Sequence, residues 1–270
     1  MTVPKGIERV DFTSLRLTDS FWAPMIRTSA RATIPVCLQR CSETGRISNF
    51  EKAAKTRTGA FEGIYYNDSD VYKVLEGIAY HLHHDRAPDL EARADAIIDS
   101  IAASQWSDGY LNSYYTLTDP SARWTDMGMH EDYCLGHLIE AAVATFQATG
   151  KRKLLDVAIR AAGHLEATFG PGRRHWVPGH QEIELALVRL WRLTGEERFR
   201  QLAHWFLEQR GRGHGRGFVW NRSDWGPPYC QDDQPVAHVH AELVAAAPPG
   251  RVRVESRPKP PSRPGCVSVG

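Results

Sequence analysis

Residues 138–164 read LIEAAVATFQATGKRKLLDVAIRAAGH, and residues 183–209 read IELALVRLWRLTGEERFRQLAHWFLEQ. The two stretches lie 45 residues apart and share a pattern of apolar positions. Five aligned pairs are identical: Ala141/Ala186, Val143/Val188, Thr149/Thr194, Gly150/Gly195 and Ala158/Ala203. A fixed period of this length is typical of a repeated helical hairpin. In each copy Thr-Gly ends the first helix, with the glycine as a left-handed cap.

Further hairpin signals lie on the N-terminal side of these two. An apolar face at helical spacing predicts a helix over residues 68–84, and a partner helix follows Pro88. A still earlier helix is predicted over residues 21–41, where Pro35 should kink or split it. We interpret residues 45–67 as a loop. Residues 106–134, rich in aromatic and acidic side chains, form a second loop that is too long for a plain connector.

A hairpin cannot bury its apolar face alone, so the hairpins must stack, either into an open solenoid or into a closed α/α toroid. We therefore predict an all-α fold built of helical hairpins. Three regions are expected: an extended segment over residues 1–20, a body of stacked helical hairpins, and a disordered tail over 237–270 that is rich in proline and basic residues.

The composition excludes several classes of protein. The 270-residue chain is 42% hydrophobic with a formal net charge of +1, so we expect no nucleic-acid and no membrane partner. No run of ~18 apolar residues predicts a membrane span. The five cysteines are scattered and the N-terminus lacks the apolar core of a signal peptide, which favours a reducing, cytoplasmic location.

The inner helices of a toroid point the same way, so the loops before them meet at one mouth. Polar residues recur in those loops, and aromatic residues such as Tyr66, Trp106 and Trp124 could stack on sugar rings. We predict a carbohydrate cleft there. The candidate substrate-binding residues are Asp68, Asp70, Asp108, Tyr110, His130, Glu131, His180 and Glu182.

Other interpretations stay open. Asp68, Asp70, Glu131 and Glu182 also fit a capping role at helix starts. In a metal-free inverting glycosidase, Asp68, Asp70, Asp108 and Glu131 would supply the acid and the base. A non-enzymatic helical scaffold that binds carbohydrate or protein is a third reading.

Four motifs carry a resemblance to a known family: GIYYNDSDVYKVLEGIAY, DGYLNSYY, HEDYCLGHLIEAAVATFQATGKRKLLDVA and PGHQEIELALVRLWRLTGEERF. In this order they resemble the N-terminal part of the catalytic domain of glycoside hydrolase family 127, the β-L-arabinofuranosidases. The resemblance runs from about residue 21 to residue 236. It implies that residues 21–236 form a partial α/α-barrel catalytic domain, an incomplete (α/α)6 toroid built of helical hairpins. It implies an (α/α)6 barrel followed by β-sandwich domains, retaining hydrolysis of terminal β-L-arabinofuranosides, and sugar contact by His130 and His180.

The family's chemistry rests on a zinc-bound cysteine nucleophile and a glutamate acid/base, in a Glu-x-Cys motif and a Cys-Cys pair. This chain has neither motif, so the catalytic residues stay unassigned, and we expect no metal site and no cofactor in this chain, although complete family members hold zinc. After residue 236 the sequence departs from the family, which suggests a shifted or truncated reading frame. We expect a catalytically incomplete protein whose unfinished barrel edge leaves self-association open.

Overall fold

The structure is a computed structural model that describes residues 10–209. Within this range the regular structure is helical, and the one β-type pairing is an isolated bridge between Phe169 and Arg174. The helices are α1 Trp22–Thr28, α2 Ile34–Glu43, α3 Arg46–Ala53, α4 Asn67–His84, α5 Pro88–Ser104, α6 Ser113–Leu117, α7 Glu131–Thr149, α8 Lys153–Thr168, α9 Glu182–Thr194 and α10 Glu197–Gln209. Short 3-10 turns occur at Phe12–Ser14, Pro120–Ala122 and Met127–Met129.

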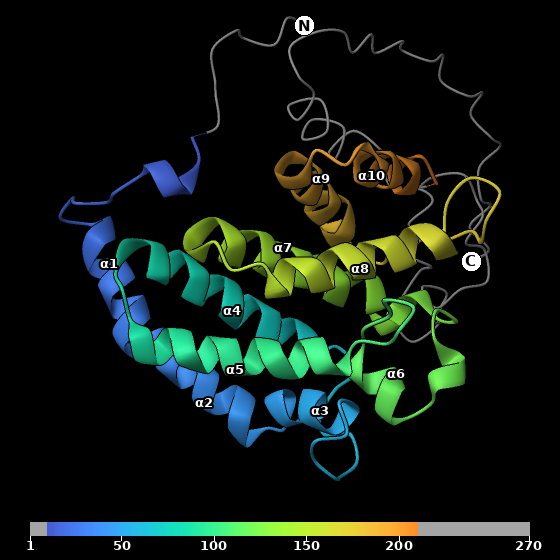
Figure 1. Cartoon of the computed structure of the whole chain (residues 1–270), viewed down its shortest axis with the longest axis horizontal. Coiled ribbons are helices and arrows are strands. Elements are labelled where there is room, and N and C mark those ends of the chain that lie inside the picture. The colour runs from blue at the N-terminus through green and yellow to red at the C-terminus, as the bar shows by residue number, and fades with distance from the viewer. Residues whose placement is uncertain (1–9, 210–270) are drawn as a thin grey trace, which may run out of the picture.

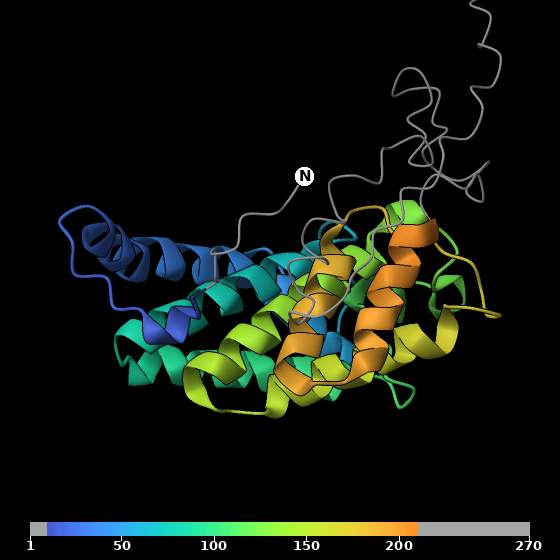
Figure 2. The same cartoon turned by 90° about the horizontal axis from the view of Figure 1, so that it is seen from above.

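The helices stack as hairpins in two layers (Figure 1). Helix α4 packs against α7 and α7 against α9, which makes an inner layer. Their partners α5, α8 and α10 pack in the same order outside them, and α2 and α3 continue the two layers beside α4 and α5. Figure 2 shows α9 and α10 side by side as the last described hairpin. The prediction of an all-α fold made of stacked hairpins is confirmed.

The two hairpins that share the sequence repeat, α7–α8 and α9–α10, have the predicted local geometry. Gly150 follows α7 with φ of 75°, and Gly195 follows α9 with φ of 74°, so both glycines are left-handed caps. Helix α7 lies between α4 and α9 and against α8, and it is therefore buried on most of its surface. Small residues such as Ala141 and Ala142 are fully buried and let the neighbouring helices approach closely.

Pro35 splits the first helix as predicted. Residues Ser29–Thr33 form a π-helical turn between α1 and α2, and Pro35 lies in the first turn of α2. Proline has no N–H to donate and its ring clashes with the carbonyl four residues earlier, so the preceding turn widens.

The prediction of a loop over residues 45–67 is wrong in its first part, because α3 occupies Arg46–Ala53. Gly45, with φ of 77°, turns the chain into this helix. The buried Asn49 binds the backbone of Glu62 through both its amide oxygen and its amide nitrogen. Apart from Phe50, the buried residues of this helix are polar (Ser48, Asn49 and Lys52), and polar residues after a glycine are easily interpreted as a loop.

The predictions for residues 1–9 and for the tail over 237–270 lie outside the described residues, as does the predicted unfinished barrel edge beyond residue 209. Residues 10–20 contain the Phe12–Ser14 turn and otherwise no helix or strand. Between residues 10 and 209, none of the helices has the length and hydropathy needed to cross a bilayer.

Candidate functional site

The N-terminal ends of the three inner helices meet at one place. The ring of His130, just before α7, lies 5.4 Å from that of Tyr66, just before α4, and 4.9 Å from that of His180, just before α9. The predicted meeting of the inner-helix starts, which we call the mouth, is therefore observed for α4, α7 and α9, while the carbohydrate cleft expected there stays a prediction. We call the side chains gathered there the mouth cluster: Tyr65, Tyr66, Lys73, His130, Tyr133, His137, His180 and Glu182.

His130 is held in an unusual backbone conformation that aims its ring across the mouth. Its φ is 61°, in the left-handed region that few residues other than glycine adopt. Its Nδ1 lies 2.6 Å from the carbonyl oxygen of Gly128, and its Nε2 lies 3.1 Å from Nε2 of His180. Because a carbonyl only accepts, Nδ1 of His130 carries a proton. In neutral His130 the bare Nε2 then accepts the Nε2–H of His180.

About two turns beyond His130, His137 of α7 faces Glu182 of α9. Its Nδ1 lies 3.1 Å from Oε1 of Glu182. Burial, reinforced by the nearby charge of Lys73, lowers the pKa of His137 from 6.5 to about 4. Burial also raises the pKa of Glu182. At neutral pH His137 is uncharged and donates Nδ1–H to the carboxylate, so the contact is a hydrogen bond and not an ion pair.

Three of the predicted residues lie in a second group, which we call the loop cluster: Trp106, Asp108, Tyr110, Arg123, Trp124, Glu131 and His164. The buried carboxylate of Glu131 accepts a 2.5 Å hydrogen bond from the hydroxyl of Tyr110 and a 2.7 Å hydrogen bond from the N–H of Trp124. Burial raises the pKa of Glu131 to about 8. These bonds fasten the long loop over residues 106–130 to the start of α7.

Asp108 lies at the outer side of the loop cluster. It accepts a 3.0 Å hydrogen bond from the N–H of Tyr110, and its carboxylate lies 3.2 Å from a guanidinium nitrogen of Arg123 and 3.6 Å from Nδ1 of His164. Partial burial acts to raise the pKa of Asp108, but the hydrogen bond from Tyr110 and the charges of His164 and Arg123 outweigh it and lower the pKa. Asp108 is therefore ionised at neutral pH and pairs within its own loop.

Asp68 and Asp70 connect neighbouring elements. The buried Asp68 accepts hydrogen bonds from the N–H (2.7 Å) and the hydroxyl of Ser113 in α6, and burial raises its pKa to about 6. The interpretation of Asp68 as a helix cap is wrong, because α4 already begins at Asn67. Asp70 forms an ion pair with Arg46 of α3, with Nε 2.7 Å from the carboxylate.

Of the eight predicted residues, the structure thus brings His130, His180 and Glu182 together at the mouth. Sequence reasoning missed Lys73, Tyr133 and His137. A signal for two of them was present, because His130, Tyr133 and His137 are spaced as i, i+3 and i+7 and so share one face of α7.

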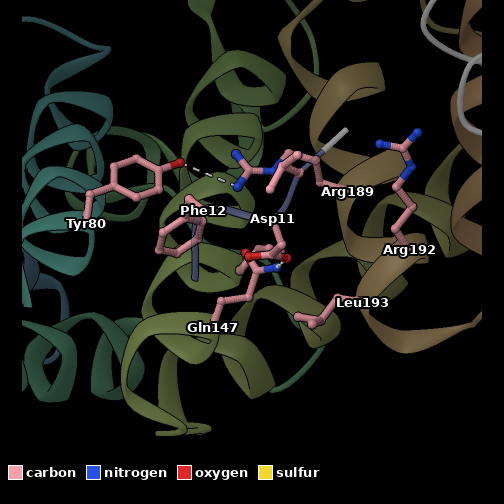
Figure 3. Close-up of a pocket in the computed structure, with 9 residues that line it drawn as sticks. Asp11, Phe12, Tyr80, Gln147, Arg189, Arg192 and Leu193 are labelled. Atoms are coloured by element: carbon pink, nitrogen blue, oxygen red, sulfur yellow. Dashed lines mark hydrogen bonds between the residues drawn. The ribbon is translucent and has the colours of Figure 1, made fainter. Parts of the chain in front are cut away.

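A hollow lies at the opposite, C-terminal end of the inner helices (Figure 3). This cavity of about 500 Å³ is lined by Val10, Asp11, Phe12, Tyr80, Val143, Gln147, Arg189, Arg192 and Leu193. Arg189 forms ion pairs with Glu140 and, at 3.6 Å, with Glu76, and donates a hydrogen bond of 3.4 Å to the hydroxyl of Tyr80. Gln147 donates a 3.0 Å hydrogen bond to Asp11. Polar groups here bind one another, in contrast to the half-exposed rings of the mouth.

The cysteines of the described range do not fit a zinc–thiolate site. The buried Cys134 donates its thiol to the carbonyl of Tyr66, and burial raises its pKa well above the usual value. Burial raises the pKa of Cys41 to about 11. Thiols with raised pKa values are poor metal ligands and poor nucleophiles. Among residues 10–209, no three His, Cys, Asp or Glu side chains come together as a metal site.

Several known proteins are similar to this chain in sequence and in fold. The family model described as "Beta-L-arabinofuranosidase, GH127 catalytic domain" matches residues 14–247. A non-reducing end β-L-arabinofuranosidase from Bifidobacterium longum subsp. longum is 42% identical over 179 residues, which cover 63% of this chain and 27% of that protein. The chain therefore spans about a quarter of the length of this curated relative.

Two solved structures agree with that match. A GH127 β-L-arabinofuranosidase from Geobacillus stearothermophilus T6 superposes with a TM-score of 0.72 at 42% identity, over 74% of this chain and 33% of the other. A second GH127 β-arabinofuranosidase gives a TM-score of 0.70 at 37% identity, over 79% and 35%. Such neighbours have helical (α/α) toroid folds, which confirms the predicted fold class.

Proposed function

The chain belongs to the GH127 family of β-L-arabinofuranosidases, and from that premise we propose that its mouth cluster binds a terminal L-arabinofuranose residue of a glycan. The observation that carries the proposal is the contact between His130 and His180 where three inner helices begin. The resemblance noted in the sequence assigns sugar contact to the same two histidines.

The chemistry of the mouth suits a small, uncharged sugar. The imidazole nitrogens of His130 and His180 can donate to and accept from ring hydroxyls, and the faces of Tyr65 and Tyr66 offer apolar surface beside them. Sugar hydroxyls would replace the bond between the two histidines, so no polar group is left without a partner.

In the family such a site serves hydrolysis of a terminal β-L-arabinofuranosidic bond. This chain lacks the family's Glu-x-Cys motif and Cys-Cys pair, so the part we propose for its described residues is to bind and orient the sugar. The loop-cluster and α4 carboxylates are engaged elsewhere, since Glu131 binds Tyr110 and Trp124, and Asp68 binds Ser113. We assign none of them as acid, base or nucleophile.

A binding measurement on the full chain tests the proposal. Methyl β-L-arabinofuranoside, titrated while side-chain resonances are followed by NMR, should bind and should shift the imidazole signals of His130 and His180. His130→Ala and His180→Ala should each weaken binding about tenfold, through the loss of a hydrogen bond in a confined site. His83→Ala, near the C-terminal end of α4, is the matched control and should leave the affinity unchanged.

Methyl α-L-arabinopyranoside, which has the same atoms in a six-membered ring, should bind more weakly than the furanoside. Equal affinity for both sugars, or unchanged furanoside affinity in both mouth variants, would contradict the proposal.

We also propose a reducing, cytoplasmic location. Cys37, Cys41 and Cys134 are all free thiols in the described range, two of them buried, which suits a compartment where thiols stay reduced.

A further inference from the structure

The ring of Tyr133 contacts all three histidines of the mouth cluster, although no sugar contact is assigned to it. Its centroid lies 5.5 Å from that of His130, 4.5 Å from that of His137 and 5.0 Å from that of His180. The contacts with His130 and His137 are edge-to-face, the arrangement that aromatic rings prefer. A shift of this one ring would move every histidine of the mouth.

Lys73 of α4 fixes that ring from the neighbouring helix. Its Nζ donates a 2.7 Å hydrogen bond to the hydroxyl of Tyr133 and a 3.2 Å hydrogen bond to the hydroxyl of Ser69, and it lies 4.7 Å from the centroid of the Tyr133 ring. Ser69 in turn donates to the carbonyl of Tyr66. The ammonium therefore links the start of α4 and the Tyr66 loop to the first turn of α7.

We propose that Lys73 is a positioning residue for the sugar site, acting through Tyr133: its ammonium fixes the Tyr133 ring, and that ring orients His130 and His180. The inference rests on the proposed function, in that the two histidines are taken as the groups that meet the sugar.

The geometry favours positioning over direct sugar contact. The ammonium has three N–H donors, and two of them are engaged by Tyr133 and Ser69. A lysine normally keeps its long side chain mobile, and immobilising it costs conformational entropy. Here two hydrogen bonds and a cation–π contact offset that cost. The same charge also helps to keep His137 neutral, so that His137 donates to Glu182.

Three variants of the full chain and one control test this role. Lys73→Met removes the charge and the donors at similar length, Tyr133→Phe keeps the ring but removes the acceptor, and Lys73→Arg keeps charge and donors. Lys153→Met, an exposed lysine of α8 that pairs with Asp99, is the control. Two readouts are taken: the imidazole resonances of the ligand-free protein, and the affinity for methyl β-L-arabinofuranoside.

Lys73→Met and Tyr133→Phe should each shift the His130 and His180 resonances without ligand and weaken sugar binding about fivefold, the value of one lost hydrogen bond. The double variant should be no worse than either single one, because both remove the same contact. Lys73→Arg should restore most of the affinity, and Lys153→Met should change nothing.

The positioning role would be overturned if the histidine resonances of Lys73→Met were unchanged, or if the losses of sugar affinity in the two single variants added up in the double variant. The two proposals fail separately. A wild-type chain that does not bind the furanoside refutes the proposed function, while the ligand-free spectra still decide whether Lys73 and Tyr133 orient the histidines.

Discussion

The two ends of the inner helices differ in what their side chains do. At the N-terminal ends, half-buried and exposed rings of Tyr66, His130 and His180 meet, and imidazole nitrogens face each other. At the C-terminal ends lies a hollow of about 500 Å³, where Arg189 is engaged by two glutamates and a tyrosine, and where Asp11 and Phe12 of the N-terminal segment line the wall. A hollow whose polar groups already bind one another offers fewer free groups to a ligand than the rings at the other end.

The connections between the helices explain the difference. At the C-terminal end of each inner helix the chain turns within a few residues, as over 85–87, 150–152 and 195–196. At the other end it runs through long segments, over 54–66, 105–130 and 169–181. Long ordered loops supply side chains that a short turn cannot, which is why binding groups gather at the mouth.

The strongest test of the comparison is Arg189→Ala at the C-terminal end. Glu140 is mostly buried and its ion pair with Arg189 would be lost, which leaves an unpaired buried charge. We expect the free energy of unfolding to fall by about 3–5 kcal/mol. Urea unfolding followed by circular dichroism measures this change.

The double variant Arg189→Met/Glu140→Leu is the matched control, because it removes both charges and fills the space with apolar groups. It should recover most of the lost stability. A large loss in the double variant, or a small one in Arg189→Ala, would show that the pair is not the stabilising element of this end.

A smaller effect is expected where α7 and α9 approach each other at the mouth. A Cβ on Gly136 would lie 2.6 Å from Cγ of Glu182 and 3.1 Å from its backbone carbonyl carbon. Gly136→Ala should therefore force the two helix starts apart, at a cost of about 1–3 kcal/mol in the free energy of unfolding.

Gly77→Ala in α4 provides the control, because nothing lies within 4 Å of its added Cβ. Alanine there should raise the stability by about 0.4–1 kcal/mol, since it reduces the freedom of the unfolded chain. Thermal unfolding of the two variants measures both changes. A destabilised Gly77→Ala together with a neutral Gly136→Ala would mean that α7 and α9 do not approach each other at Gly136 as described.

Sequence reasoning succeeded where the signal was local. The hairpins over 131–168 and 182–209 follow from helical periodicity and a Thr-Gly cap, both of which act within a few residues. It missed α3, whose Asn49 is held by Glu62 beyond the end of the helix. That bond joins residues 13 apart, and it satisfies one of the polar side chains that α3 buries beside Phe50, which the sequence alone does not reveal.

The site was predicted in part for the same reason. His130 and Glu131 are adjacent in the sequence and were assigned to one pocket, but they lie in different clusters. The left-handed backbone of His130 directs its ring to the mouth, while Glu131 points to Tyr110 in the loop cluster. No composition or spacing rule predicts that reversal, because it depends on how the long loop before α7 packs.

The smallest effect concerns acid, and it should arise at the mouth. The pKa of His137 is about 4 in the folded chain and 6.5 when unperturbed, so the unfolded chain takes up this proton first as the pH falls. The stability that rests on neutral His137 is fully present above pH 6.5 and is lost as the pH falls toward 4. Since His137 is partly screened by solvent, we expect a loss of about 1–2 kcal/mol over this range.

His137→Gln keeps a donor for Glu182 but does not titrate, so its stability should fall less between pH 7 and pH 4 than that of the wild type. Asp68 and Glu131 have raised pKa values, and their protonation works the other way, stabilising the fold as the pH falls. Both proteins share these carboxylates, so the difference between their urea-unfolding curves isolates His137. Parallel curves across the whole range would contradict this prediction and place the acid sensitivity outside the mouth.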